Sequence, residues 1–256
     1  MACSFGSVPA ARHGMPIEPL HIVLATAMKF SIIIPTLNEA QNIQNCLSAL
    51  QPLRDDCEII VVDGGSIDDT PAIAEPLADR VIRSPKGRAR QMNAGAKQAA
   101  GEALLFLHAD TFLPGHAIRL IRGRISQARP WGRFDIHLTG DHFMLKVIAR
   151  MMNWRSRLTG IATGDQVIFV MREAFTAVGG YPDIGLMEDI ALSKALNKIS
   201  PPLCLKATVT SSGRRWLQFG LYKTILLMWS LRLRYFFGAD PQTLARLYNG
   251  GRLWKP

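Results

Sequence analysis

Short apolar runs alternate with amphipathic segments over the first hundred residues that follow Lys29. The apolar runs predict strands at 29–35, 58–65, 80–84 and 103–110. Helical spacing or helix-favouring composition predicts helices at 38–50, 68–77, 88–100 and 114–125. Strands that are apolar on both faces must be covered on both sides. The alternation therefore predicts an α/β sandwich with a mostly parallel central sheet and helices on both faces.

The second half of the chain is less regular. Alternating polarity at 132–140 predicts an outer strand, and 166–171 predicts a further strand. Helices are predicted at 143–158, 188–196 and 216–237, and the first and last of these are amphipathic and basic. Residues 1–27 are rich in Pro, Gly and Ala with little periodicity, which is typical of a flexible leader. No apolar run approaches the about eighteen residues of a membrane span.

Charge and cysteine content narrow the class of protein. The 30 Lys and Arg residues exceed the 20 Asp and Glu residues, giving a formal net charge of +10. Such a balance indicates an anionic partner, which could be a nucleic acid, a phosphorylated small molecule or a membrane surface. The four cysteines form no C-x-x-C pair, so we interpret them as reduced thiols of a cytoplasmic protein rather than as zinc ligands.

Polar residues gather where three predicted strands end. The segments 35–39 (PTLNE), 63–66 (DGGS) and 108–111 (HADT) fall at the carboxyl ends of strands, where α/β sheets bind ligands. Asp63 could accept hydrogen bonds from a base or ribose, and its following glycines let the backbone approach a ligand closely. The structural alternative is a pair of ordinary turns, with Asn38 and either Ser66 or Asp68 as helix caps.

Two further segments suggest charge chemistry on a phosphorylated ligand. Arg88 and its basic neighbours lie at a predicted helix N-terminus, which already favours an anion such as a diphosphate; the alternative is a solvated basic patch. In an extended HAD segment the side chains of His108 and Asp110 would point the same way, forming half of a Mn²⁺ or Mg²⁺ site. Alternatively, Asp110 caps the next helix and His108 is structural.

Glu188 and Asp189 open a predicted helix. Acidic residues stabilise helix N-termini, which is a sufficient structural explanation. The functional alternative is a general base, because two adjacent carboxylates repel and the proton affinity of one rises.

Six segments, taken in their order along the chain, resemble glycosyltransferase family 2, whose fold is called GT-A. They are PTLNE, VVDGGSIDDT, GRARQMNAGA, LLFLHAD, GDQVIFVMREAFTAVGGYP and MEDIALSKAL. The resemblance covers about 29–216, and HAD, GDQ, MED and SSGRRW are most similar to a bacterial subgroup named for arsenosugar biosynthesis. It implies inverting, metal-assisted transfer of a sugar from a nucleotide diphosphate sugar, with a UDP-sugar favoured, to an acceptor hydroxyl. We divide the chain into leader 1–27, catalytic domain 28–213 and helical extension 214–256.

The resemblance also implies roles for individual residues. Asp189 would be the catalytic base with Glu188 as support, and Asp110 would bind Mn or Mg as the last residue of a D-x-D motif whose first position is His108. Arg214, Arg215 and Trp216 resemble the end of the Q-x-x-R-W motif of processive relatives, but the Gln is absent, so polymer synthesis is not implied. The nucleotide-sugar site would comprise Pro35, Thr36, Asn38, Glu39, Asp63, Ser66, Arg88, Asn93 and His108. The acceptor side would comprise Gly164, Asp165, Gln166, Arg214, Arg215 and Trp216.

The basic amphipathic helices leave two interpretations open. Their apolar faces could pack on the sheet, and we favour this interpretation for 143–158. Alternatively they could lie on the inner face of the cell membrane, and we favour this interpretation for 216–237. Membrane contact would suit a lipid-linked acceptor. A sugar nucleotidyltransferase would instead need a Gly- and Arg-rich loop after the first strand, and PTLNE is not one. A non-enzymatic protein that binds nucleic acid or membrane would explain the charge but not the acids at strand ends, so we expect no nucleic-acid partner.

Overall fold

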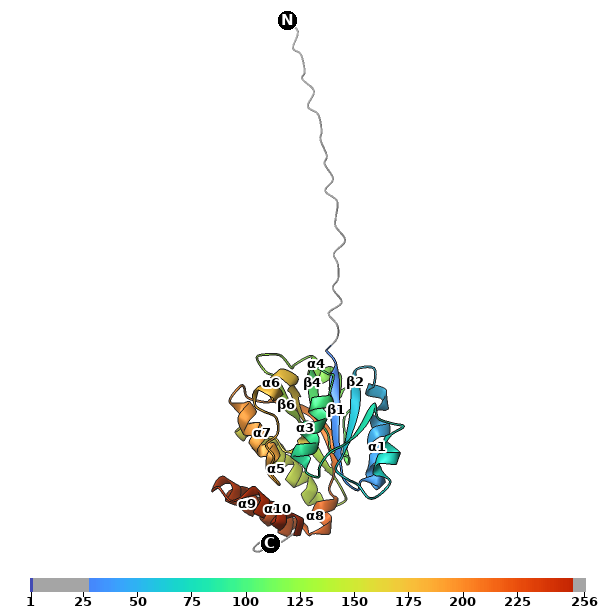
Figure 1. Cartoon of the computed structure of the whole chain (residues 1–256). Coiled ribbons are helices and arrows are strands. Elements are labelled where there is room, and N and C mark those ends of the chain that lie inside the picture. Colours follow the sequence, from blue (N-terminus) through green and yellow to red (C-terminus); the bar gives the residue numbers. More distant parts are fainter. Residues whose placement is uncertain (2–27, 251–256) are drawn as a thin grey trace.

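An eight-stranded mixed sheet forms the centre of the computed structural model, which describes Met1 and residues 28–250 (Figure 1). Its order is β3-β2-β1-β4-β7-β6-β8-β5. Helices cover both faces, which confirms the predicted α/β sandwich (Figure 1). The strands are β1 (Phe30–Thr36), β2 (Cys57–Asp63), β3 (Arg80–Arg83), β4 (Ala103–Phe106), β5 (Thr111–Phe112), β6 (Trp131–Thr139), β7 (Ile168–Met171) and β8 (Leu203–Ser212).

The helices follow the predicted segments to within a few residues: α1 to α4 are shorter than predicted, and α5 and α7 are each one residue longer. The predicted helix at 216–237 is the exception, because Gly220, with φ of 84°, separates α8 from α9. The α-helices are α1 (Ala40–Leu50), α2 (Thr70–Ala74), α3 (Arg88–Gln98), α4 (Ala117–Arg122), α5 (Phe143–Thr159), α6 (Arg172–Ala177), α7 (Glu188–Asn197), α8 (Arg214–Gln218), α9 (Leu221–Phe236) and α10 (Pro241–Gly250). The 3₁₀ turns are η1 (Gln51–Leu53) and η2 (Gly164–Gln166).

The N-terminal half of the sheet is parallel and deeply buried. β1 pairs with β2 on one side and β4 on the other, and β3 pairs with β2, all in parallel. The apolar runs predicted as strands supply residues with no exposed surface, such as Ile33 and Ile60. Thr36 lies opposite Asp63 in the register, so the loops that follow β1 and β2 begin side by side.

The C-terminal half of the sheet is mixed. β7 runs antiparallel to both β4 and β6, and β6 pairs in parallel with β8 on its other side. The expectation that 132–140 is an outer strand is therefore wrong, because β8 covers it. β8 was not predicted, because its sequence, LCLKATVTSS, mixes polar and apolar residues and is buried only at intervals. The hydrophobic pattern of the sequence also did not predict β5, α6 and α10.

Buried polar contacts fix α5 to β6. Arg133 has no exposed surface, and its guanidinium donates to Ser156 Oγ at 3.0 Å and to the carbonyl of Asn153 at 3.1 Å. The same guanidinium pairs with Asp135, which also contacts Arg157. The Asn153 amide bonds the Ile136 backbone in both directions, at 2.9 and 3.0 Å. Because this buried charge is paired and its donors are used, α5 is held in one orientation on the sheet.

The C-terminal helices pack against the start of α7 (Figure 1). A second hydrophobic cluster joins Leu227 and Leu231 of α9, Leu244 and Leu247 of α10, and Leu186, Met187 and Ile190. The other face of α9 is apolar but exposed, along a stripe formed by Tyr222, Leu226, Trp229, Leu233 and Phe236. Within residues 28–250, no helix is both long and apolar enough to span a membrane. The boundary between 213 and 214 stays a prediction, and the predicted leader, after Met1, lies outside the described residues.

Candidate active site

The loops that follow β1 and β2 are tied together. The Asn38 backbone N–H donates to Ser66 Oγ at 2.9 Å, and the Ile67 N–H donates to Asn38 Oδ1 at 2.9 Å. Asn38 has a φ of 54° and precedes the helix, so it does not cap α1 as the alternative interpretation proposed. The two predicted nucleotide segments therefore form one surface at the carboxyl edge of the sheet.

Asp63 organises the second of these loops. Its carboxylate is buried and accepts the N–H groups of Gly65 and Ser66, each at 3.0 Å. Gln91 of α3 supports both loops from below, because its buried amide donates to the carbonyls of Thr36 and Val62, each at 2.8 Å. Sequence reasoning missed Gln91, although a glutamine on the buried face of a predicted helix was the available signal.

The HAD segment is a turn and not the end of a strand. β4 ends at Phe106, and the Thr111 N–H closes the turn onto the His108 carbonyl at 3.0 Å. His108 Nδ1 lies 3.3 Å from Asp165 Oδ1, whereas Asp110 Oδ2 lies 3.3 Å from Arg214 Nη2. The expectation that both side chains face the same partner is therefore wrong, because an extended backbone was assumed. Asp110 also does not cap α4, which begins after His116.

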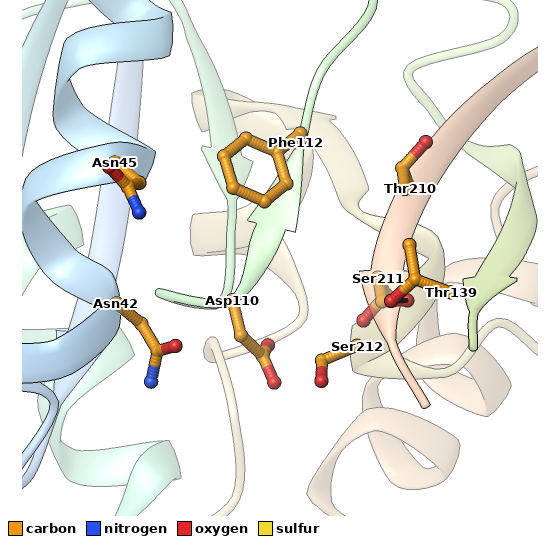
Figure 2. A pocket seen from close by; sticks show the side chains of 8 residues that line it. All are labelled: Asn42, Asn45, Asp110, Phe112, Thr139, Thr210, Ser211 and Ser212. Carbon is orange, nitrogen blue, oxygen red and sulfur yellow. Dashed lines mark hydrogen bonds between the residues drawn. The ribbon is translucent and has the colours of Figure 1, made fainter. Parts of the chain in front are cut away.

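Asp110 lines an open polar pocket of about 240 Å³ (Figure 2). Asn42 and Asn45 of α1 form one wall, and the carboxylate of Asp110 points into the space between them and Ser212. Arg214 Nη2 lies 3.9 Å from Glu39 Oε2 as well as close to Asp110, so one guanidinium serves two carboxylates. The remaining lining residues are Phe112, Thr139, Thr210 and Ser211.

Three carboxylates meet where η2 approaches α7. Asp189 Oδ2 accepts the Gly164 N–H at 3.1 Å, and its Oδ1 accepts the Ile190 N–H at 2.7 Å. Glu188 precedes it in the first turn of α7 and is buried, and Asp165 follows Gly164. A Cβ at Gly164 would lie 2.6 Å from His108 Nε2, so only glycine permits this approach of η2 to the imidazole.

Burial and neighbouring charges give Glu188 and Asp165 different proton affinities. Burial raises the pKa of Glu188, and the charge of Asp189 raises it further, against the opposing charge of Arg88. Burial would also raise the pKa of Asp165, but its contact with His108 and the charges of His108 and Arg88 outweigh this and lower the pKa. The cluster therefore contains one carboxyl that binds a proton readily and one that remains ionised.

Arg88 faces this cluster from the N-terminus of α3. Burial lowers the pKa of Arg88, but Tyr248 of α10 and the acids Glu188, Asp165 and Asp189 outweigh that effect and raise it. A guanidinium at a helix N-terminus adds to the positive end of the helix dipole. The site thus has an acidic side and a side that favours an anion. Tyr248 was missed, since its helix was not predicted.

Several predicted site residues have other contacts. Asn93 uses its side-chain amide on the Tyr181 backbone, donating to the carbonyl at 2.7 Å and accepting the N–H at 3.0 Å. Its place in the nucleotide-sugar site stays a prediction without geometric support. Gln166 is buried and bonds Thr163 and Asn153. Pro35 lies near the end of β1, and Trp216 packs on the core. The backbone of Arg215 belongs to α8.

Two arginines on the C-terminal side of the cleft were not singled out by sequence. Arg155 of α5 and Arg232 of α9 both interact electrostatically with Asp189. Both belong to segments interpreted only as basic amphipathic helices. The sequence held no signal for these contacts, because they depend on how α5 and α9 pack.

The sequence profile of glycosyl transferase family 2 matches residues 31–175, more than half of the chain. The chain belongs to glycosyl transferase family 2. This match spans the loops after β1 and β2, the HAD turn and η2. The narrower arsenosugar-type subgroup stays a prediction.

Individual relatives match shorter stretches. A PGL/p-HBAD biosynthesis glycosyltransferase of Mycobacterium bovis is 42% identical over 95 residues, covering 34% of this chain and 37% of the relative. The dolichol-phosphate mannosyltransferase of Pyrococcus furiosus is 38% identical over 101 residues, covering 36% of this chain and 28% of that protein. The chain thus aligns with about a third of the length of these curated relatives.

Solved structures establish the fold as GT-A. The mannosyltransferase PcManGT of Pyrobaculum calidifontis, in complex with GDP-Man and Mn²⁺, superposes with a TM-score of 0.61 at 19% identity, covering 89% of this chain and 70% of that one. Glucosyl-3-phosphoglycerate synthase of Mycobacterium tuberculosis, in complex with Mn²⁺, UDP and glucosyl-3-phosphoglycerate, gives 0.54 at 16% identity, with 72% and 71% covered.

Replacing Glu188 should stabilise the protein in a pH-dependent manner. Since the folded-state pKa is raised above its ordinary value of 4.5, the stabilising contribution is complete below that pH and is lost as the pH rises through the folded-state pKa. Glu188→Gln removes this titration. We expect its free energy of unfolding at pH 8 to exceed that of the native protein by on the order of 1 kcal/mol, with the difference vanishing near pH 4.

Urea denaturation at the two pH values measures this difference. The exposed Glu102→Gln provides the matched control and should leave the free energy of unfolding within about 0.5 kcal/mol at both. A Glu188→Gln variant that is less stable than the native protein at pH 8 would show that the Glu188 charge is favourably paired.

Proposed function

We propose that this protein transfers a sugar, with inversion, from a nucleotide diphosphate sugar to an acceptor hydroxyl. The carrying observation is the electrostatic interaction of Asp189 with Arg88, which lies at the N-terminus of α3. A carboxylate that can take a proton then faces a position that favours a diphosphate. Membership of glycosyl transferase family 2 supports the same reaction class.

Asp189 acts as the base in this reaction. Burial and the charge of Asp189 raise the pKa of Glu188, and we assign to Asp189 the role of accepting the acceptor hydroxyl proton. The acceptor oxygen then bonds the anomeric carbon on the face opposite the leaving group, through a transition state with oxocarbenium character. The bond from that carbon to the diphosphate oxygen breaks, and its electron pair leaves with the nucleoside diphosphate. Arg88 and the α3 N–H groups stabilise that growing charge.

A divalent cation fits the site only together with its substrate. In the part of the chain that the structure describes, no three His, Cys, Asp or Glu side chains gather as a ligand set. Mg²⁺ commonly uses one or two carboxylates plus substrate phosphates and water, and Asp110 supplies one partly exposed carboxylate. Such a cation would neutralise charge on the leaving diphosphate. Arg214 contacts the same carboxylate and would compete with the cation for it.

The donor would lie over the joined loops after β1 and β2. The Asn38 and Ser66 contacts and the N–H groups gathered by Asp63 give this surface a fixed shape for a base and ribose. PcManGT was solved with GDP-Man and the mycobacterial synthase with UDP, so either base is compatible with this fold. A UDP-sugar remains our expectation. A nucleotidyltransferase receives no support from this loop, which lacks the Gly- and Arg-rich sequence.

The exposed stripe on α9 supports a peripheral contact with a membrane. Trp229 is 63% exposed and Phe236 is 74% exposed, while the opposite face of the same helix is already packed on α7 and α10. Aromatic and aliphatic side chains on the outer face of a basic helix suit the interfacial region of an anionic bilayer. A lipid-linked acceptor would then reach the cleft from this surface.

Two substitutions separate the roles of the carboxylates. We expect Asp189→Asn to lower turnover at least about a hundredfold, as loss of a general base does, and to leave nucleotide affinity in the presence of Mn²⁺ unchanged. We expect Asp110→Ala to weaken that affinity at least tenfold. Isothermal titration calorimetry with the nucleotide that the protein binds measures the affinity, and an assay of donor consumption measures turnover. The reverse pattern would contradict both assignments.

Membrane contact is tested by flotation with vesicles of phosphatidylcholine and phosphatidylglycerol. We expect the native protein to float with these vesicles. The double variant Trp229→Gln, Leu233→Gln should bind them at least about tenfold more weakly, because it lacks apolar area that the bilayer would bury. Ile199→Gln changes an exposed apolar residue outside the stripe and should bind as the native protein does. Native protein that stays with the aqueous phase would refute the contact.

A further inference from the structure

Arg155 and Arg232, which are both partly buried, have buried nitrogen atoms that lack acceptors. Arg155 Nε and Nη2 and Arg232 Nε have no hydrogen-bond partner within residues 28–250. Neither arginine forms an ion pair in that part of the chain, whereas buried Arg133 is paired with Asp135 and bonded to α5. A buried N–H of a charged group that lacks an acceptor is destabilising, so these donors indicate a missing partner.

The two arginines lie close enough to repel each other. Burial and, after it, the charge of Arg232 lower the pKa of Arg155 to about 10, against the opposing effect of Asp189. Burial likewise lowers the pKa of Arg232, against Asp189 and Asp165. The acids of the cleft are thus near but do not neutralise the pair. An anion with several acceptor oxygens would satisfy both guanidinium groups together.

Each arginine sits at the margin of an exposed apolar surface. On α5, Arg155 lies between exposed Trp154 and buried Ser156. On α9, Arg232 lies between buried Leu231 and exposed Leu233. A group bound between these two helices would have Asp189 on its inner side and the exposed apolar side chains on its outer side.

We propose that Arg155 and Arg232 form an acceptor subsite that binds a phosphoryl group. This assignment rests on the proposed glycosyl transfer and names the class of acceptor: a molecule whose phosphoryl group docks on the two guanidinium groups and thereby presents its hydroxyl to Asp189. The phosphoryl group is a binding handle and takes no part in bond making. A phosphate monoester carries about −1.5 to −2 charges at pH 7, which suits two unpaired cations.

The subsite is separate from the position expected for the donor diphosphate. Asp110 contacts Arg214, and Glu39 approaches the same guanidinium. The electrostatic neighbours of Arg155 and Arg232 are instead Asp189, Asp165 and Arg133. Arg88 also has Asp165 and Asp189 as electrostatic neighbours, but it lies at the N-terminus of α3, whereas the pair belongs to α5 and α9. The acceptor phosphoryl group and the donor therefore approach Asp189 from different elements.

The test measures binding of phosphate without any nucleotide. Inorganic phosphate is titrated into the full chain, into Arg155→Gln, Arg232→Gln and the double variant, and into the exposed control Arg119→Gln. We expect native affinity for the control, a several-fold loss for each single variant and at least a tenfold loss for the double variant. Phosphate should raise the melting temperature of the native protein and not that of the double variant. Each glutamine substitution removes a charge that has no ion-pair partner, so the variants should fold. If only one single variant keeps the native circular dichroism spectrum, that variant suffices for the binding comparison.

A second arm identifies the source of the phosphoryl group. Vesicles of phosphatidylcholine with and without phosphatidic acid present a phosphate monoester at a lipid surface. A loss of phosphatidic acid-dependent binding in the double variant assigns the subsite to a lipid phosphate, whereas a loss confined to inorganic phosphate assigns it to a soluble phosphorylated acceptor. Unchanged binding in both arms overturns the proposal.

Nucleotide binding keeps this proposal distinct from the proposed function. With Mn²⁺ present, we expect UDP or GDP to bind the double variant as tightly as the native protein. An equal loss of nucleotide and phosphate affinity would overturn the acceptor assignment, since the pair would then serve the donor. A native protein that binds phosphate through this pair but binds no nucleotide would refute the glycosyl transfer and leave a phosphate site.

Discussion

Three carboxylates held together at the junction of η2 and α7 set the arrangement of the cleft. Asp189 is fixed by the Gly164 and Ile190 N–H groups, Glu188 is buried beside it, and Asp165 is held by His108. Acids this close repel one another unless cations face them or one binds a proton. Positive charge near these acids comes from arginines on three different helices, α3, α5 and α9. In addition, the raised pKa of Glu188 favours its protonated form.

That charge balance joins the C-terminal helices to the rest of the cleft. Arg232 of α9 and Tyr248 of α10 both interact with groups of the acidic cluster or with Arg88. The hydrophobic cluster of α9, α10 and the start of α7 holds these side chains in place. Because α9 is apolar on its exposed face as well, one helix connects the surface proposed for a membrane with the acids proposed for catalysis. Of the elements proposed for the acceptor side, α8 and α9 lie outside the matched family region, whereas α5 and η2 lie inside it.

The sequence predicted the parts of the fold that depend on continuous apolar runs. Strands such as β1 and β2 are buried on both faces, so their composition alone identifies them, and the acids at their ends follow from topology. β8 mixes polar and apolar residues and could not be recognised before its partner β6 was known. Because the HAD segment is a turn, His108 and Asp110 contact different partners, Asp165 and Arg214. The contacts of Gln91, Arg155 and Arg232 depend on helix packing, which a hydrophobic pattern does not specify.

The most direct measurement is a thermal-shift panel of UDP, GDP, dTDP and CDP on the native protein, each with and without Mn²⁺. A ligand that binds only the folded state raises the melting temperature by mass action. The account predicts a rise for one nucleoside diphosphate, with UDP expected, and predicts that the rise depends on the metal. No rise with any nucleotide, with or without Mn²⁺, would contradict a nucleotide-sugar site at this edge of the sheet.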